Sequence, residues 1–320
     1  MTHLVISPCR NEAEFMEHTL ASVAAQTRRP DLWIIVDDGS TDATPEILKC
    51  FAAENDWVRV VQKPDRGFRA VGPGVIEAFY FGLDAAGGLG GFDYVTKLDL
   101  DLVVPPRYFE ILLGRMEADP RIGTCSGKPY FRGEDGALKS ERRGDEMSAG
   151  MTKVYRARCF EDIGGFVREV MWDGIDCHKC RQKGWVACSW DEPNLVFEHL
   201  RPMGSSQRGI LTGRARHGYG QYFMGSDPLY FLATAIFRMR DKPYVLGGLA
   251  TVWGYAKAWA ARENRLADAP LRAFIRRYQR RALMVGKSRA TAEFDKAGEA
   301  IFKERRLLDA AAARKAPQTA

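Results

Sequence analysis

The N-terminal part of the chain repeats one pattern twice: a short apolar strand, a polar turn and an amphipathic helix. Residues 4–7 and 32–36 are the two apolar runs, and apolar residues at helical spacing follow each of them. Repeated strand–helix units form a parallel sheet, because each helix carries the chain back to the same edge. Ligands of such sheets bind at the carboxyl ends of the strands. The repeat therefore predicts an α/β domain whose functional residues gather along one edge of the sheet.

Polar residues occur where three of the predicted strands end. The third strand, at residues 94–104, is a largely apolar run interrupted by Asp99 and Asp101. Side chains at positions i and i+2 of a strand share one face, and two carboxylates that close repel each other unless a cation lies between them. Alone, the pair also reads as two solvent-facing acids at a strand end. The clusters at residues 8–12 and 37–42 lie on the same predicted edge, however, and the three clusters together predict a binding site.

The order and spacing of three motifs resemble glycosyltransferase family 2. The motifs are Pro8-x-Arg10-Asn11-Glu12, the run Val-Asp-Asp-Gly-Ser-Thr-Asp at residues 36–42, and Asp99-x-Asp101, and the resemblance covers about residues 3–205. It implies a GT-A fold, a Rossmann-like mixed sheet flanked by helices, and inverting transfer of a sugar from a nucleotide-diphosphate donor. A UDP-sugar is the commonest donor among such relatives. The implied acceptor is lipid-linked or a saccharide, and the implied cofactor is a divalent cation, Mg²⁺ or Mn²⁺.

The resemblance also assigns residues to the donor site. It places the nucleotide sugar at Pro8, Arg10, Asn11, Glu12, Asp37, Asp38, Arg66, Arg69, Lys97, Asp99 and Arg201. It places the metal at Asp99, Asp101 and His199. Imidazole is an acceptable ligand beside carboxylates, and guanidinium groups match phosphate oxygens. On the residues alone, the loop with Arg66 and Arg69 also reads as a charged surface loop, and a lone histidine such as His199 is often structural.

A catalytic base is implied at the head of a predicted helix near residue 172. Relatives carry a Glu-Asp-x-Asp-like sequence there, whereas this chain reads Asp173-Gly174-Ile175-Asp176, with glycine in place of the central aspartate. Asp173 and Asp176 are both candidates for the base that takes the proton of the acceptor hydroxyl. Asp173 is the stronger one, since it would face the cleft beside Trp172. An acid at a helix start is also an ordinary capping residue.

Composition fits one large α/β core with an appendage, since the chain has 320 residues and is 46% hydrophobic. The odd number of cysteines, seven, and an N-terminus without a signal segment suggest a cytoplasmic location. Cys177-x-x-Cys180 lacks the second pair that a structural zinc site needs. The predicted segments are a GT-A domain at 1–205, with a nucleotide-binding half at 1–102 and an acceptor half at 103–205, a helical extension at 206–309 and a flexible tail at 310–320.

The extension combines short apolar stretches with an arginine-rich one. Residues 228–237 and 243–256 are apolar but too short to span a bilayer. Residues 262–289 are basic and carry an apolar helical stripe, which consists of Leu271, Phe274, Ile275, Tyr278 and Ala282. This pattern predicts an in-plane amphipathic anchor, peripheral on the inner face of the plasma membrane. The alternative is a helical subdomain packed on the core or on a second protomer. Nucleic acid is not an expected partner, because no groove-reading motif accompanies the basic residues.

Two other functions remain open for this sequence. A nucleotidyltransferase, which makes nucleotide sugars, also uses a nucleotide-binding α/β sheet, but such enzymes usually open with a glycine-rich basic loop that is absent here. A non-catalytic sugar-binding or scaffold protein with the same fold is the other alternative, because Gly174 departs from the pattern of relatives.

Overall fold

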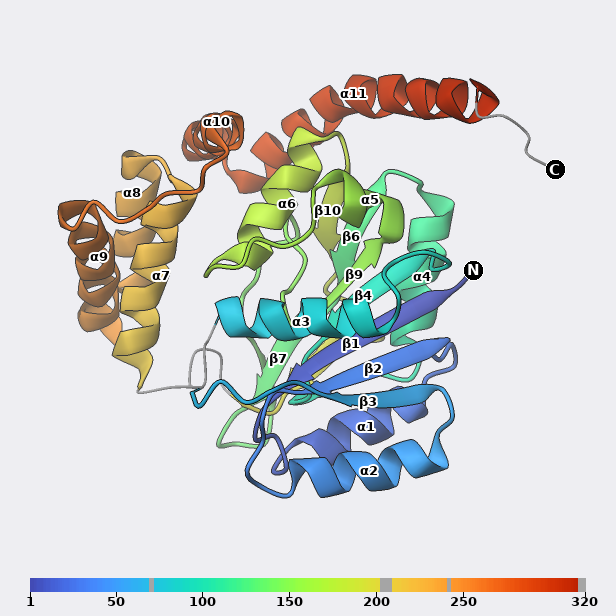
Figure 1. Ribbon diagram of the computed structural model, residues 1–320. Helices are drawn as coiled ribbons and strands as arrows, with labels where there is room; N and C mark the ends of the chain where they lie inside the picture. Colours follow the sequence, from blue (N-terminus) through green and yellow to red (C-terminus); the bar gives the residue numbers. More distant parts are fainter. Residues whose placement is uncertain (69–71, 202–208, 241–242, 316–320) are drawn as a thin grey trace.

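The computed structural model describes residues 1–68, 72–201, 209–240 and 243–315, with the backbone alone for 308–315 (Figure 1). Its centre is a seven-stranded mixed sheet in the order β10-β6-β9-β4-β1-β2-β3, in which only β9 runs antiparallel to its neighbours. The strands are β1 (His3–Cys9), β2 (Leu32–Asp37), β3 (Val58–Gln62), β4 (Tyr94–Leu98), β6 (Ile122–Ser126), β9 (Thr152–Arg156) and β10 (Val186–Ser189).

A second, four-stranded sheet lies beside the carboxyl ends of the central strands, in the order β5-β11-β7-β8. Its strands are β5 (Leu102–Val103), β7 (Lys128–Arg132), β8 (Leu138–Ser140) and β11 (Val196–His199). The apolar run at 94–104 is therefore two strands, not one, because β4 ends at Leu98 and β5 joins the other sheet. Asp99 and Asp101 lie in the connection between the two sheets.

Helices cover both faces of the central sheet, so its inner strands are buried on both sides and read as continuous apolar runs. Val5 packs with Leu20 and Leu48 on one face, whereas Leu4 and Ile6 pack with Phe79 on the other. The first face is covered by α1 (Met16–Ala24), α2 (Thr44–Glu54) and α4 (Tyr108–Ala118), and the second by α3 (Pro73–Ala85), α5 (Ala157–Asp162) and α6 (Trp172–Gln182).

The remaining chain forms the helical extension: α7 (Ile210–Met224), α8 (Pro228–Arg238), α9 (Tyr244–Ala260), α10 (Ala269–Val285) and α11 (Lys287–Lys315). Helices α7 and α9 lie against each other at a distance that only glycine allows. A Cβ atom on Gly218 would lie 1.9 Å from the Thr251 carbonyl oxygen, and one on Gly254 would lie 1.9 Å from that of Ala215. Helix α11 continues to Lys315, so the predicted tail at 310–320 begins inside a helix.

The apolar stripe of α10 is buried inside the protein. Leu271, Ile275, Tyr278 and Ala282 are each less than a tenth exposed, and the helix packs against α6, α8 and α11. The prediction of an in-plane anchor formed by this stripe is therefore wrong, because its apolar face is already occupied. For α10 the alternative, a helix packed on the core, is correct.

The largest group of exposed apolar side chains in the extension belongs to α8 and α9. They are Leu229, Leu232, Ile236 and Phe237 on α8, and Tyr244, Val245, Leu246, Leu249, Trp253 and Trp259 on α9. We call this set the α8–α9 apolar surface. Within the described part of the chain, no helix combines the length and the apolar character that crossing a bilayer requires.

Candidate active site

A cavity of about 390 Å³ lies at the carboxyl ends of β1 and β4 and reaches α7 on its far side. It brings together residues from both halves of the predicted GT-A domain. Ten of the predicted site residues line it: Pro8, Arg10, Glu12, Asp38, Lys97, Asp99, Asp101, Asp173, His199 and Arg201. Asn11, Asp37, Arg66 and Asp176 lie outside this lining, and Arg69 falls outside the described residues.

Asn11 and Asp37 shape the turns at the strand ends. Asn11 has a left-handed backbone, with φ of 54°, and its side-chain oxygen accepts a hydrogen bond from the Thr41 amide at 2.8 Å. Asp37 accepts one from the Ser40 amide at 2.9 Å. Asn11 therefore holds the loop after β2 against the loop after β1, and Asp37 closes the turn within the loop after β2.

Arg66 contributes to the cavity through Asp38. Its guanidinium lies 2.8 Å from the Asp38 carboxylate, and Lys63 reaches the same carboxylate at 3.1 Å. Arg10, from the first loop, donates to the Asp38 carbonyl oxygen at 2.5 Å and to Asp65 at 2.6 Å. Three basic side chains thus surround the acidic turn after β2 and hold it in place.

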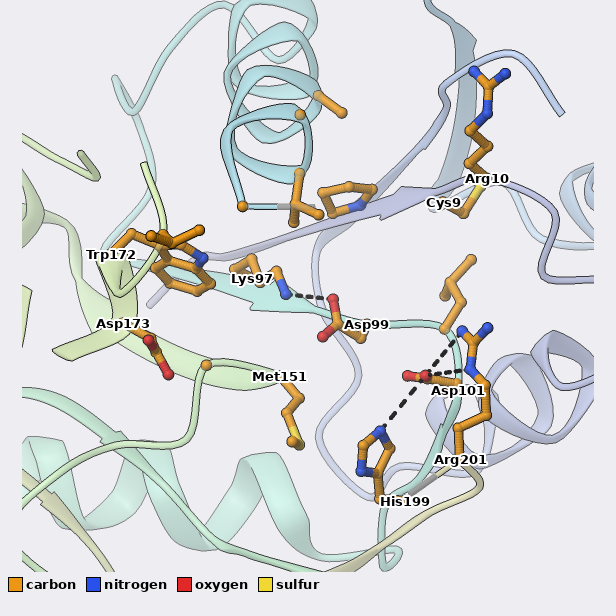
Figure 2. Close-up of a pocket in the computed structure, with 18 of the residues that line it drawn as sticks. Cys9, Arg10, Lys97, Asp99, Asp101, Met151, Trp172, Asp173, His199 and Arg201 are labelled. Atoms are coloured by element: carbon orange, nitrogen blue, oxygen red, sulfur yellow. Dashed lines mark hydrogen bonds and ion pairs between the residues drawn. The ribbon is translucent and has the colours of Figure 1, made fainter. Parts of the chain in front are cut away.

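The acidic pair is split between two sets of partners (Figure 2). Asp99 pairs with Lys97 in a short contact, whereas Asp101 faces His199 and Arg201. The prediction that both carboxylates share one face assumed a single regular strand. The chain instead passes from one sheet to the other at these residues, so the regular spacing of a strand does not apply to them. Among the described residues, no group of three or more His, Cys, Asp and Glu side chains is arranged to hold a metal ion.

Asp101 and His199 nevertheless form a usable ligand pair. Asp101 Oδ2 lies 3.6 Å from His199 Nε2, close enough for one cation to contact both. Burial raises the pKa of Asp101, but His199 and Arg201 outweigh it and lower the value to about 2. Burial lowers the pKa of His199, but Asp101 and Glu141 raise it to about 9. The imidazole beside Asp101 therefore carries a proton in this structure, and it would have to lose that proton to serve as a metal ligand.

Asp173 lies on the opposite wall of the cavity, in the first turn of α6. Its side chain is 26% exposed, and Arg143 Nη1 lies 3.5 Å from its carboxylate. Burial raises the pKa of Asp173, but Arg143, Lys153 and Lys97 together lower it below the ordinary aspartate value. The carboxylate is therefore ionised at neutral pH and open to a ligand, as a general base requires.

Asp176, the other candidate base, faces the protein interior. Its side chain is 1% exposed, Lys153 Nζ lies 2.5 Å from Oδ1, and the Tyr155 hydroxyl donates to Oδ2 in a short contact. Lys153 also donates to the Asp173 carbonyl oxygen at 2.6 Å. Burial lowers the pKa of Lys153, but Asp176, Cys177 and Asp173 raise it overall. The buried pair thus holds the start of α6 in place beneath Asp173.

Asp176→Asn is expected to destabilise the protein by about 3–5 kcal/mol, because it leaves the Lys153 charge buried without its counterion. Asp173→Asn is the matched control, since its carboxylate is partly exposed and its loss should change stability by less than about 1 kcal/mol. The free energy of unfolding in urea measures both. Equal stabilities for the two variants would show that Asp176 does not neutralise a buried charge.

Several residues in or beside the cavity were not among the predicted site residues. Arg143 comes from the charged segment after β8, and Arg216 and His217 come from α7, which closes the wall beside Asp173. Glu141 accepts a hydrogen bond from His199 Nδ1 at 2.9 Å and so fixes the ring that faces Asp101. These residues lie on segments that only the tertiary fold brings to the cavity.

The Cys177-x-x-Cys180 motif is part of the core. Both residues belong to α6 and have fully buried side chains, and Cys180 Sγ lies 3.5 Å from Cys159 Sγ. None of the seven cysteines forms a disulfide, and all of them lie in the described part of the chain.

The family model "Glycosyl transferase family 2" matches residues 4–172. Over 131 residues the chain is 30% identical to poly-beta-1,6-N-acetyl-D-glucosamine synthase of Staphylococcus aureus and 29% identical to that of Staphylococcus epidermidis. Each match spans 41% of this chain and 29% of the relative, so the larger part of each relative's sequence lies outside the match.

Two solved structures share the fold at low identity. Mannosyltransferase PcManGT from Pyrobaculum calidifontis, in complex with GDP-Man and Mn²⁺, matches 96% of this chain and 87% of its own, with TM-score 0.50 and 20% identity. GalNAc-T7 with UDP, GalNAc and Mn²⁺ matches 82% of this chain and 56% of its own, with TM-score 0.52 and 15% identity. The predicted GT-A fold is confirmed. The chain belongs to glycosyl transferase family 2 and is a glycosyltransferase.

Proposed function

We propose that the protein is a metal-dependent, inverting enzyme that moves a sugar from a nucleotide-diphosphate donor to an acceptor hydroxyl. The observation that carries the proposal is the opposition of two groups in one cavity. Asp101 and His199 lie at the donor end, where a cation fits, and the ionised Asp173 lies across from them, next to α7. A displacement reaction needs both a group that stabilises the leaving diphosphate and a base that takes the proton of the acceptor. A protein that only binds sugars needs no such base.

The donor end is suited to a diphosphate. A divalent cation held by Asp101 and His199, with phosphate oxygens and water as further ligands, would offset the charge of the leaving diphosphate. Arg201 lies beside these groups and contacts both Asp101 and Glu12, so its guanidinium is held where phosphate oxygens would arrive. Lys97 keeps Asp99 at the edge of this site. We infer that Mg²⁺ or Mn²⁺ serves, because both accept carboxylate and phosphate oxygens.

The chemical step is a single displacement. The oxygen of the acceptor hydroxyl attacks the anomeric carbon while Asp173 accepts the proton of that hydroxyl. The bond from the anomeric carbon to the diphosphate breaks on the opposite face. Attack opposite the leaving group inverts the anomeric configuration, and no covalent intermediate forms. Arg143 keeps the carboxylate ionised and oriented, while the buried pair Lys153–Asp176 fixes the helix that carries it.

The similar proteins support the substrate classes. The staphylococcal relatives are named as synthases of an N-acetylglucosamine polymer, which favours a saccharide product. The two structures with a shared fold contain GDP-Man or UDP together with Mn²⁺, which favours a nucleotide-linked donor and a divalent metal. We propose a UDP-sugar as donor and a lipid-linked or saccharide acceptor.

A membrane surface is the proposed location, on the cytoplasmic side where the sequence suggested it. The support is now the α8–α9 apolar surface and not the stripe of α10. Helix α9 packs on α7, and α7 lines the cavity next to Asp173. An acceptor held in a bilayer that contacts α8 and α9 would therefore approach the cavity from the side of the base.

The function is tested by a thermal-shift panel of UDP, GDP and ADP, each with Mn²⁺, Mg²⁺ or EDTA. A ligand that binds only the folded protein raises the melting temperature, by an amount that depends on its affinity. We expect one nucleotide to raise it in the presence of a metal and clearly less in EDTA. Absence of a shift for every nucleotide and metal pair would contradict the proposed donor, and an equal shift in EDTA would contradict the metal.

A further inference from the structure

A second cavity, of about 540 Å³, lies among α8, α9 and α10 and shares no lining residue with the active site. Three arginines and two aromatic side chains dominate it: Arg265, Arg276, Arg280, Tyr255 and Trp259. We call it the arginine cavity. So dense a positive charge in a concave site suggests that it binds an anion.

The arginines are held in place, and of Arg276 and Arg280 only Arg280 pairs with a carboxylate. Arg276 Nε donates to the Gly225 carbonyl oxygen at 2.9 Å, which brings no negative charge. Arg280 Nε donates to Asp227 at 2.6 Å, and the same carboxyl group caps α8 by accepting from the Leu229 amide at 3.0 Å. Both contacts use Nε, so the terminal nitrogens of each guanidinium take no part in them.

Arg265 adds a third positive group. Its guanidinium carbon lies over the Tyr222 ring, 4.4 Å from the ring centre, a cation–π contact that brings no negative charge. Among the described residues that line the arginine cavity, none is acidic. Asp227, buried behind Arg280, is the single carboxylate in ionic contact with these three arginines within the described ranges.

The rim of the arginine cavity belongs to the α8–α9 apolar surface. Trp259 lines the cavity and is 65% exposed, and Pro228 lines it one residue before Leu229, which is 71% exposed. A tryptophan with one apolar and one polar edge is suited to the boundary between a bilayer and water. A positively charged cavity and an exposed apolar surface therefore adjoin each other.

We propose that the arginine cavity binds the phosphate of an anionic phospholipid headgroup while the acyl chains lie along the α8–α9 apolar surface. Guanidinium groups bind phosphate oxygens in a forked geometry, so three of them surround one phosphate well. The proposal rests on the proposed membrane association and adds the residues that recognise the lipid. It gives a specific role to arginines that the sequence showed only as part of a basic segment.

Helix α10 also supplies a matched control. Arg277 and Arg281 are next to the proposed residues in sequence but lie outside the arginine cavity. Arg277 contacts the rings of Phe274 and Phe294, and Arg281 pairs with Glu293 at 2.6 Å. The double variants R276Q/R280Q and R277Q/R281Q therefore remove the same charge from the same helix.

Binding is measured first with dihexanoyl phosphatidylglycerol below its critical micelle concentration, by calorimetry. Glycerol 3-phosphate and dihexanoyl phosphatidylcholine are the comparison ligands. We expect R276Q/R280Q to weaken phosphatidylglycerol binding at least roughly 10-fold, since each arginine near an anionic lipid contributes about 1 kcal/mol. R277Q/R281Q should weaken it less than about 3-fold. Equal losses in both variants would overturn the proposal in favour of diffuse attraction.

The other measurements distinguish a lipid site from the remaining explanations. Glycerol 3-phosphate that binds as tightly as the lipid would show a site for water-soluble phosphates and would overturn the lipid assignment. Co-sedimentation of the wild-type protein with phosphatidylglycerol vesicles tests membrane association itself, and its failure would overturn both proposals on the membrane. The nucleotide-dependent thermal shift is recorded for every variant, so a loss of folding or of the transferase function is recognised separately.

Discussion

Asp173→Asn is expected to slow sugar transfer by roughly 10²- to 10⁴-fold, the usual scale for a lost general base. Asparagine keeps the size of the side chain and its place in the first turn of α6, but it cannot accept the proton of the acceptor hydroxyl. The donor residues lie on the other wall of the cavity, so nucleotide binding should remain within a few-fold of wild type. Single-turnover transfer at saturating donor measures the rate, and the thermal shift by the nucleotide measures binding.

Asp176→Asn distinguishes this prediction from the alternative base. At Asp176 the carboxylate is buried between Lys153 and Tyr155, so its loss should act through stability and through the position of α6. The rate of Asp176→Asn, measured at a temperature where the variant is folded, should fall less than that of Asp173→Asn. The reverse order would make Asp176 the base and would require α6 to turn toward the cavity.

The sequence was most informative where function depends on strand ends. Strand, turn and helix follow one another at short range, so the apolar runs at 4–7 and 32–36 were sufficient to predict β1, β2 and the edge where the cavity lies. The motifs at residues 8–12 and 37–42 then pointed to the family, and the family model confirms it. Local pattern determined this part of the fold.

The acidic pair shows what local pattern cannot supply. The alternation of Leu98, Leu100 and Leu102 reads as one strand, and on one strand Asp99 and Asp101 would share a face. The chain instead leaves one sheet and joins another between them, which is a tertiary event without a local signal. Asp99 consequently pairs with Lys97, and Asp101 pairs with His199 from β11, about a hundred residues further along the chain.

The helical extension shows the same limit for amphipathic patterns. An apolar stripe predicts that a helix buries one face but not against what. On α10 the stripe Leu271, Ile275 and Tyr278 packs on the protein, whereas α8 and α9, whose apolar residues extend around the helix, leave part of their surface exposed. Arg216 and His217 reach the cavity because α7 packs closely on Met171, where a Cβ atom on Gly220 would lie 2.3 Å from Met171 Cγ, and no sequence motif predicts this contact.

Asp101→Asn is expected to remove the metal-dependent part of nucleotide binding. The variant keeps the shape of the side chain but loses the charge that attracts a divalent cation, and it leaves His199 as a lone ligand. Because substitutions of residues that merely support metal ligands already cost about 10- to 100-fold in affinity, losing a ligand should cost at least roughly 100-fold. Transfer should become undetectable at metal concentrations that saturate the wild-type enzyme.

The measurement is the thermal shift caused by the nucleotide with Mn²⁺ and with EDTA, supported by titration of Mn²⁺ followed by electron paramagnetic resonance. For Asp101→Asn the two shifts should be equal and small. Asp135→Asn is the control, because Asp135 is 58% exposed, its partner Lys139 is 48% exposed, and neither residue lines the cavity. A full Mn²⁺-dependent shift in Asp101→Asn would move the metal away from Asp101. If Asp99→Asn then abolished the shift, Asp99 would have to leave Lys97 when the donor binds, and the pairing of these two side chains would describe only the ligand-free enzyme.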